Sequence, residues 1–243
     1  MLEKDCYFDF QQFRIHQNHA AMKVGTDSDL LGALCATGRR ILDVGTGTGV
    51  LALMMAQRCA DAQITAVEID DGAVIDAKRN FEESRFGSRI TLVHSSFQDF
   101  VAAQQPGAAP FDCVVCNPPY FDRSLECPDQ SRTRARHTSS LPFAVLIEGA
   151  FGLLEPEGVF SVCIPPEVLE DFVSLCRRAG FWLQAQYCIK TIPEKGPKRF
   201  VVVCRKGEVA APRQEVYCMR NSDRTRSPWY RELMKDFLLC GEK

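Results

Sequence analysis

Residues 40–59 have the sequence RILDVGTGTGVLALMMAQRC, and this stretch decides the fold. The apolar run at 40–44 predicts a buried strand, three glycines at alternate positions follow it, and residues 50–59 have the composition of a helix. A strand, a glycine loop and a helix in this order bring backbone N–H groups and a helix N-terminus close to a ligand. The stretch therefore predicts one βα unit of a ligand-binding α/β domain.

Alternating strands and helices extend this unit along the chain. Further strands are predicted at 64–69, 89–94, 112–116, 159–164, 182–189 and 199–205. Helices are predicted at 71–83, 141–154, 166–179 and 228–239. Residues 7–16 indicate a short strand or hairpin, and we expect Asp27 or Ser28 to cap a helix that carries Leu30, Leu31 and Leu34. Such alternation predicts a doubly wound, mostly parallel sheet with both faces covered.

Chemically distinctive residues follow several of these strands directly. Glu68 ends the second strand and lies 19 residues past Gly49, where a doubly wound sheet places an acid that accepts the ribose hydroxyls of a nucleotide. Asn117-Pro118-Pro119-Tyr120 (NPPY) follows the strand at 112–116, and two prolines in succession end a strand sharply. An amide, rigid carbonyls and an aromatic ring together suit a flat ring that carries an amine. All these features belong to the carboxyl edge of the sheet, where ligands of such folds bind.

The glycine loop alone fits several nucleotides. An NAD site prefers GxGxxG, whereas the third glycine here comes one residue earlier, and an NAD enzyme would leave NPPY without a role. The sequence has no GxxxxGK[ST], which excludes a P-loop.

Composition indicates a globular domain. The chain has 243 residues, of which 46% are hydrophobic and 25% charged, and no apolar run approaches the length of a membrane span. We therefore expect a cytoplasmic protein without a membrane contact. Residues 1–176 hold 14 Lys and Arg against 24 Asp and Glu, whereas 177–243 hold 15 against 7. This asymmetry indicates either an end that faces a polyanion or an ordinary solvated surface.

Cysteine is abundant, with twelve residues, but lies mostly inside apolar runs, where it acts as a small hydrophobe. The one CxxC, Cys113 to Cys116, falls within a predicted strand, so its two thiols should point to opposite faces. We therefore expect neither a metal site nor a disulfide framework.

DVGTGTG, Glu68 and NPPY together resemble class I S-adenosylmethionine-dependent methyltransferases that act on amino groups in planar systems. The start of the chain, FQQF followed after seven residues by AMKVGTDSDLLGAL, resembles the bacterial valine tRNA (adenine, position 37)-N6-methyltransferases. The resemblance continues through ECPDQSRTRARHTSSL and SPWYREL and covers nearly the whole chain. It implies a Rossmann-like sheet of seven strands with an antiparallel last strand, and methylation of the adenine next to the anticodon of valine tRNA.

The resemblance also implies roles for individual residues. Asn117 and the Pro118 carbonyl would accept from the target amine, and Tyr120 would stack on the extruded base. The residues assigned to the cofactor are Lys23, Thr26, Asp27, Asp43, Gly45, Gly47, Gly49, Glu68, Ile69, Ser96, Phe97 and Asn117. Many relatives carry an acid where this sequence has Ser96, so Ser96 or Asp99 is expected to face the cofactor adenine. The product would be S-adenosylhomocysteine, and no metal is implied.

Binding of the tRNA anticodon loop is expected to use exposed cations. They are Arg132, Arg134, Arg136, Lys195, Lys198, Arg199, Arg224 and Arg226. The first three lie in a long polar loop, 121–140. The implied organisation is an N-terminal segment, 1–39, that completes the cofactor site, a methyltransferase domain, 40–206, and a basic tail with a docking helix, 207–243. No obligate protein partner is inferred.

Two other functions stay open. A protein glutamine N5-methyltransferase shares the NPPY motif, but its relatives usually carry a separate N-terminal helical domain, for which there is no room before residue 40. An inactive methyltransferase fold that serves as an RNA-binding module is the other alternative, and the intact DVGTGTG and NPPY motifs argue against it.

Overall fold

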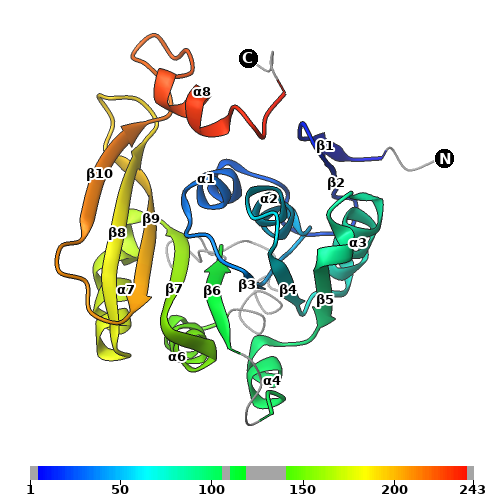
Figure 1. Ribbon diagram of the computed structural model, residues 1–243. Helices are drawn as coiled ribbons and strands as arrows, with labels where there is room; N and C mark the ends of the chain where they lie inside the picture. The colour runs from blue at the N-terminus through cyan, green and yellow to red at the C-terminus, as the bar shows by residue number, and fades with distance from the viewer. Residues whose placement is uncertain (1–4, 106–109, 119–140, 240–243) are drawn as a thin grey trace, which may run out of the picture.

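A single eight-stranded sheet forms the centre of the computed structural model, with helices on both faces (Figure 1). The structure describes residues 5–105, 110–118 and 141–239. The strand order is β10-β8-β9-β7-β6-β3-β4-β5, and only β9 runs antiparallel to its neighbours. The strands are β3 (Arg40–Val44), β4 (Gln63–Glu68), β5 (Ile90–His94), β6 (Phe111–Cys116), β7 (Leu154–Ile164), β8 (Phe181–Lys190), β9 (Pro197–Lys206) and β10 (Arg213–Cys218).

The helices divide between two hydrophobic cores, one on each face of the sheet. The helical elements are α1 (Thr26–Leu34), α2 (Val50–Arg58), α3 (Asp71–Glu83), η1 (Gly87–Arg89), α4 (Phe97–Ala102), α6 (Phe143–Leu153), η2 (Pro166–Val168), α7 (Leu169–Arg178) and α8 (Pro228–Met234). Side chains of α1, α2, α3 and α8 enter one core, and those of α4, α6 and α7 enter the other. Successive residues of β3 alternate between the cores, since Ile41 belongs to the first and Leu42 to the second.

The predicted doubly wound fold is confirmed, with one strand more than the seven expected. The extra strand, β10, extends the sheet beyond β8 in parallel orientation. Its sequence, RQEVYC, has no apolar run because it lies at the edge of the sheet, where most of its side chains are at least partly exposed. The expected helix at 228–239 is shorter and ends at Met234. The chain then turns to pair with the N-terminus, where the Phe237 carbonyl accepts from Gln11 N at 2.8 Å.

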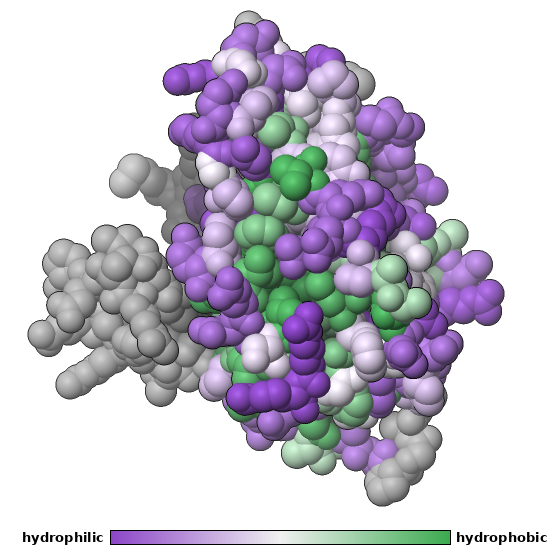
Figure 2. All heavy atoms as spheres, turned by 90° about the vertical axis from the view of Figure 1, so that its left-hand side faces the viewer, coloured by the Kyte–Doolittle hydropathy of each residue, from purple (hydrophilic) through white to green (hydrophobic). Residues whose placement is uncertain are grey.

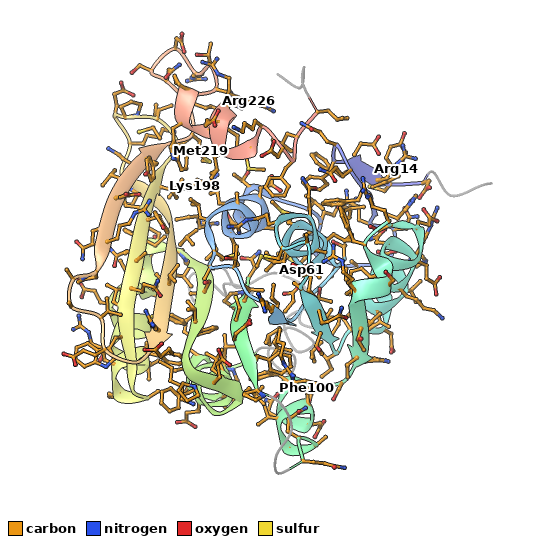
Figure 3. The ribbon with its side chains drawn as sticks, in the orientation of Figure 1. Arg14, Asp61, Phe100, Lys198, Met219 and Arg226 are labelled. Atoms are coloured by element: carbon orange, nitrogen blue, oxygen red, sulfur yellow. The ribbon has the colours of Figure 1, made fainter. Side chains whose placement is uncertain are left out.

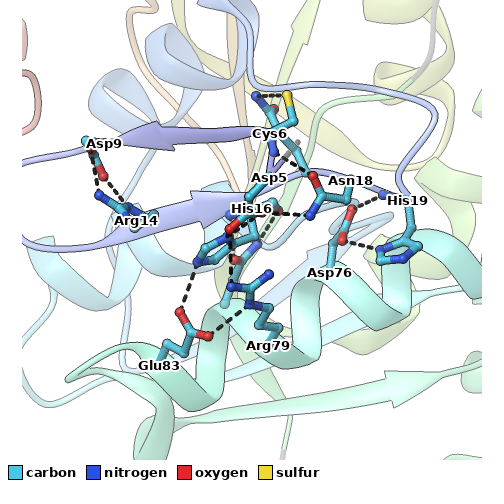
Figure 4. Close-up of polar contacts among 12 residues, drawn as sticks. Asp5, Cys6, Asp9, Arg14, His16, Asn18, His19, Asp76, Arg79 and Glu83 are labelled. Atoms are coloured by element: carbon cyan, nitrogen blue, oxygen red, sulfur yellow. Dashed lines mark hydrogen bonds and ion pairs between the residues drawn. The ribbon is translucent and has the colours of Figure 1, made fainter. Parts of the chain in front are cut away.

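An N-terminal hairpin, β1 (Tyr7–Asp9) and β2 (Arg14–His16), packs against α3 and confirms the hairpin reading. The buried His16 ring lies between carboxylates of Asp5 and Glu83, at 3.2 and 2.9 Å (Figure 4). Asp76 of α3 accepts from the ring and the backbone N–H of His19. These contacts fix the segment that leads into α1.

The carboxyl ends of β3, β4, β6, β7, β8 and β10 lie at the same end of the sheet, which we call its carboxyl edge. This follows from the pairing, because β8 is antiparallel to β9, which is itself antiparallel to β7. Loops that follow these strands therefore share one end of the molecule. Among the described residues, no helix has the length and apolarity that crossing a membrane requires.

Candidate functional site

The glycine loop and the NPPY segment leave the sheet side by side. Val44 of β3 is the register partner of Cys116 of β6 and of Val67 of β4. The next residues along these strands are Gly45, Asn117 and Glu68. The three features that the sequence placed at strand ends therefore meet at the centre of the carboxyl edge.

The glycines of the loop serve two different purposes. All three have positive φ, and a Cβ at Gly45 or Gly47 would meet no atom of the described residues beyond its chain neighbours within 4 Å, which leaves space for a ligand above the loop. At Gly49 a Cβ would lie 2.4 Å from the Phe81 ring of α3. Gly49 is the N-cap residue of α2, and its lack of a side chain permits close packing of α3 against the start of that helix.

Asp43 is a buried acid directly beneath the loop. It is 1% exposed, and its Oδ2 accepts from the Thr46 hydroxyl at 2.6 Å. Within the part of the chain that the structure describes, its Oδ1 has no hydrogen-bond partner. Burial raises the pKa of Asp43 to about 7, and the nearby charge of Glu68 acts in the same direction. An orphaned carboxylate oxygen of this kind suits a ligand that brings a donor or a positive charge.

Glu68 ties β4 to the loop through its backbone contacts. Its Oε2 accepts from Gly47 N at 2.8 Å, and its Oε1 accepts from the N–H groups of Ile69 and Asp70, each at 2.9 Å. A carboxylate offers about four acceptor positions, so these bonds leave room for one further donor. Ile69 is 53% exposed beside this carboxylate and offers an apolar surface there.

Ser96 is the N-cap of α4 and is engaged with Asp99. Its hydroxyl accepts from Asp99 N at 3.0 Å and donates to Asp99 Oδ2 at 2.6 Å. The pair forms a capping arrangement in which Asp99 is exposed. The side chain of Phe97 is 5% exposed and packs in the core close to Gly149.

The N-terminal turn of α1 differs from the expected capping. The N-cap is Gly25, and no side chain caps the helix, so the prediction that Asp27 or Ser28 would do so is wrong. Thr26 is the first residue of the helix. Asp27 accepts instead from Arg199 Nε of β9 at 2.8 Å. The Lys23 ammonium donates to Cys6 Sγ at 3.3 Å, on the side of the N-terminal hairpin.

Asn117 reaches across to α1. Its Nδ2 donates to Ser28 Oγ at 3.1 Å, a contact between residues 89 positions apart. Pro118 is buried next to it, whereas Tyr120 lies outside the described residues. This contact of Ser28 could not be predicted from the sequence, because a serine early in a helix is ordinarily interpreted as a cap.

Two basic loops stand at the same edge of the sheet. We define the first as residues 190–199, which run from the end of β8 through the connecting turn to the start of β9. The second is residues 219–226, after β10. Ser222 of the second loop donates to Glu194 of the first, and Met219 N donates to the Lys190 carbonyl at 2.9 Å. Lys198, Met219 and Arg226 lie at this end of the molecule (Figure 3).

The surface of this end is mostly hydrophilic, as the upper part of Figure 2 shows. Lys195, Lys198 and Arg224 are exposed, and Arg226 is partly exposed. Arg220, which the sequence analysis did not select, is exposed in the second loop, while Arg199 is committed to Asp27. Arg132, Arg134 and Arg136 lie outside the described residues.

The CxxC pair behaves as its strand position predicts. Cys113 belongs to the core that contains α2 and Cys116 to the core that contains α6, so the thiols point to opposite faces. Burial raises the pKa of both thiols. Within the described ranges, no group of His, Cys, Asp or Glu side chains has the arrangement of a metal site.

The chain matches a family of known proteins. The model of the methyltransferase small domain matches residues 19–163. A tRNA1(Val) (adenine(37)-N6)-methyltransferase of Phocaeicola vulgatus is 46% identical over 198 residues, which cover 81% of this chain and 82% of that protein. Its counterpart of Bacteroides thetaiotaomicron is 39% identical over 236 residues, which cover 96% of this chain and 97% of that protein.

Solved structures agree on the fold. The crystal structure of a predicted O-methyltransferase from Agrobacterium tumefaciens superimposes with a TM-score of 0.66 at 21% identity, and the match covers 87% of this chain and 96% of that one. TrmN from Thermus thermophilus matches with a TM-score of 0.51 at 21% identity, over 74% of this chain and 47% of that one. At these identities the likeness shows the fold alone.

Proposed function

The chain belongs to the family of tRNA1(Val) (adenine(37)-N6)-methyltransferases, and from this membership we propose that it methylates the N6 amino group of adenine 37, next to the anticodon, in valine tRNA. The single observation that carries the proposal is the position of Asn117. The register of β3 and β6 sets this amide beside the glycine loop, so an amine acceptor and a cofactor loop share one edge.

The residues at this edge fit S-adenosylmethionine. The unpaired Oδ1 of buried Asp43 suits a cationic ligand, and the open space above Gly45 and Gly47 admits one against the backbone. Glu68 has one acceptor position left for a ribose hydroxyl, and exposed Ile69 offers an apolar surface for an adenine ring. When bound, S-adenosylmethionine supplies a methyl group on a positively charged sulfur.

The other cofactor residues are proposed with narrower roles. The Ser96 hydroxyl donates its one hydrogen bond to Asp99. The acceptor for the cofactor adenine amine would therefore be either the remaining lone pair of Ser96 or the Asp99 carboxylate. Gly49 and Phe97 would shape the site through packing. Lys23, Thr26 and Asp27 would flank it from the start of α1.

The target amine is a weak nucleophile because its lone pair is delocalised into the adenine ring. Asn117 Oδ1 and the Pro118 carbonyl would accept from the amine and stabilise the positive charge that develops on it. Preorganised polar groups of this kind contribute about 3 kcal/mol each. Holding the amine in line with the methyl group supplies a further part of the acceleration, and the proton can leave after transfer without a strong base. Tyr120 would stack on the extruded base.

The basic loops are proposed to hold the tRNA backbone. Lys195, Lys198, Arg224 and Arg226 share the edge of the sheet at which the methyl acceptor stands, so phosphates of an anticodon loop bound there would approach them. Arg132, Arg134 and Arg136 are proposed to add to this surface. Because tRNA is the proposed partner, the enzyme would act in the cytoplasm.

The test is an in vitro methylation assay. The protein is incubated with labelled S-adenosylmethionine and either bulk tRNA or a peptide release factor, and each product is digested and identified. N6-methyladenine at position 37 of valine tRNA is the expected product. Label in a glutamine of the release factor, or no label in either substrate, would refute the proposed function.

A further inference from the structure

Arg220 and Arg226 face each other across the second basic loop. The two residues form an isolated antiparallel bridge, and backbone hydrogen bonds of 2.9 Å join the residues on either side of the pair. This pattern makes the arginines a non-hydrogen-bonded pair, in which the Cα atoms lie about 4.5 Å apart. The two side chains therefore leave the same face of the loop at the closest spacing that a β-ladder allows.

This spacing sets two positive charges side by side, which destabilises a ladder unless another group compensates it. Within the part of the chain that the structure describes, neither arginine has an acid as an ion-pair partner. Exposed Arg220 donates from Nη1 to the Arg224 carbonyl at 2.7 Å, which fixes its guanidinium and leaves most of its five donors for another partner. An anion bound between the two arginines would relieve the repulsion.

The phenol of Tyr230, in α8, feels both of these charges. The residue is 9% exposed, and burial and the charge of Asp29 raise its pKa to about 12, whereas the charges of Arg226 and Arg220 act in the opposite direction. Arg226 lies next to α8 (Figure 3). Burial raises the pKa of Asp29 itself to about 7, so this acid is only partly charged at neutral pH. Since a Coulomb interaction weakens with distance, both guanidinium groups lie toward the same end of α8.

We infer that Arg220 and Arg226 together clamp one backbone phosphate of the bound tRNA. This inference rests on the proposed function and assigns one contact of the RNA. A guanidinium is a planar fork that matches two oxygens of a phosphate, and two forks on one bridge can hold the same group from both sides. The loop has a defined shape before RNA binds, because Asn221 Nδ2 donates to Thr225 Oγ1 at 2.9 Å across it.

The clamp is remote from the methyl acceptor. In the order β10-β8-β9-β7-β6, four strand spacings of about 4.8 Å separate β10 from β6, so the ends of these strands are at least about 19 Å apart. Both strands end at the carboxyl edge, which places the clamp and Asn117 at the same end of the sheet. The clamped phosphate therefore belongs to a nucleotide other than the methylated one, and the contact would set the position of the tRNA on the enzyme.

The test measures binding of valine tRNA to Arg220→Gln, to Arg226→Gln and to the double variant, by fluorescence anisotropy at a series of salt concentrations. Each single variant should lose affinity about tenfold, and the double variant should lose clearly less than the roughly 100-fold that two independent contacts would give. In the double variant the slope of log affinity against log salt should fall by about 0.7–0.9, the value of one phosphate.

Two controls accompany the binding series. Arg177→Gln removes one charge at the opposite end of the strands and should change neither affinity nor slope. In all variants the affinity for the cofactor and the rate at saturating tRNA should stay unchanged, because the clamp contacts neither the cofactor nor the target nucleotide.

The stability of the free protein separates a clamp from a structural pair. Replacement of Arg226 removes the repulsion, so the unfolding midpoint of Arg226→Gln should equal or exceed that of the unaltered protein. A lower midpoint would assign this arginine to folding and overturn the inference.

The other outcomes are equally decisive. Additive losses with a slope that falls by about 2 would mean two separate phosphates, and unchanged binding would remove the pair from the RNA surface. An equal loss in Arg177→Gln would mean a general effect of charge. Binding and methylation are measured separately, so a protein that shows these binding losses but methylates no adenine would overturn the proposed function alone. An active enzyme whose affinity for tRNA does not depend on the pair would overturn the clamp alone.

Discussion

Asn80 joins the N-terminal hairpin to the glycine loop, and its replacement by alanine should destabilise the protein strongly. The side chain is fully buried in α3. Its Oδ1 accepts from His16 N at 2.7 Å, and its Nδ2 donates to the carbonyls of His16 and Thr48, at 2.9 and 2.8 Å. Alanine would leave one N–H and two carbonyl groups without this partner.

The expected loss follows from these three groups. A buried polar group that loses its partner costs about 1–3 kcal/mol, and local relaxation recovers part of that, so we expect the free energy of unfolding to fall by about 3–5 kcal/mol. For a chain of this size each kcal/mol lowers the unfolding midpoint by about 2–4 °C, which gives a shift of about 10 °C. Cofactor affinity should fall as well, because Thr48 belongs to the glycine loop.

Urea titration followed by circular dichroism measures the free energy, and calorimetry measures cofactor affinity. Asn18→Ala is the matched control, because Asn18 accepts from Cys6 N at 2.6 Å and donates to Asp5 at 2.7 Å from an exposed position before α1. Water can replace its partners, so we expect a loss below about 1 kcal/mol. If both variants lose the same free energy, the burial argument is refuted.

Three further outcomes are expected. Asn117→Ala should reduce methyl transfer at least about 100-fold while cofactor binding survives in calorimetry; an equal loss of both would make Asn117 structural. Burial and the charge of Asp27 raise the pKa of Asp29 to about 7, so the native state holds this proton longer than the unfolded chain and stability falls as the pH rises from about 4 to 7. Asp29→Asn should therefore raise the free energy of unfolding in urea by less than about 1 kcal/mol at pH 4 and by about 4 kcal/mol at pH 8, and a gain independent of pH would contradict the assignment. Neutralising Lys195, Lys198, Arg224 and Arg226 together should weaken tRNA binding and lower the slope of log affinity against log salt by about 2–3, whereas neutralising Arg177 and Arg178, at the opposite end of the strands, should leave the slope unchanged.

Much of the fold could be predicted because its signals are local. The strands at 40–44 and 112–116 are short apolar runs that end just before a glycine loop or a proline pair. The structure gives the first the same bounds and begins the second one residue earlier, at Phe111. β10 could not be predicted, because an edge strand needs no apolar face and its pairing with β8 is set by tertiary contacts. The end of α8 was misplaced for a similar reason, since the contact of Phe237 with Gln11 joins the two ends of the chain.

The features of the candidate site also differ in how far they could be predicted from the sequence. The position of Glu68 could be predicted from its spacing from the glycine loop, because a βα unit has a fixed geometry, and the structure joins its carboxylate to Gly47 N. The contact of Ser28 with Asn117 could not be predicted, because the two residues are 89 positions apart and a single sequence contains no signal for such a pair. The packing of Gly49 could not be predicted either, because the Phe81 ring that excludes a side chain there comes from α3.

Three successive side chains in the first turn of α1 face three different parts of the molecule. Asp27 holds Arg199 at the end of a basic loop, Ser28 holds the Asn117 amide, and Asp29 is buried on the side of α8, where its charge adds to the effect of burial in raising the pKa of Tyr230 to about 12. The segment AMKVGTDSD, which gave the sequence its likeness to adenine methyltransferases of tRNA, thus ends in residues that contact Arg199 and Asn117. We propose that this segment serves the methyl acceptor and its RNA as well as the cofactor, to which Lys23, Thr26 and Asp27 are assigned.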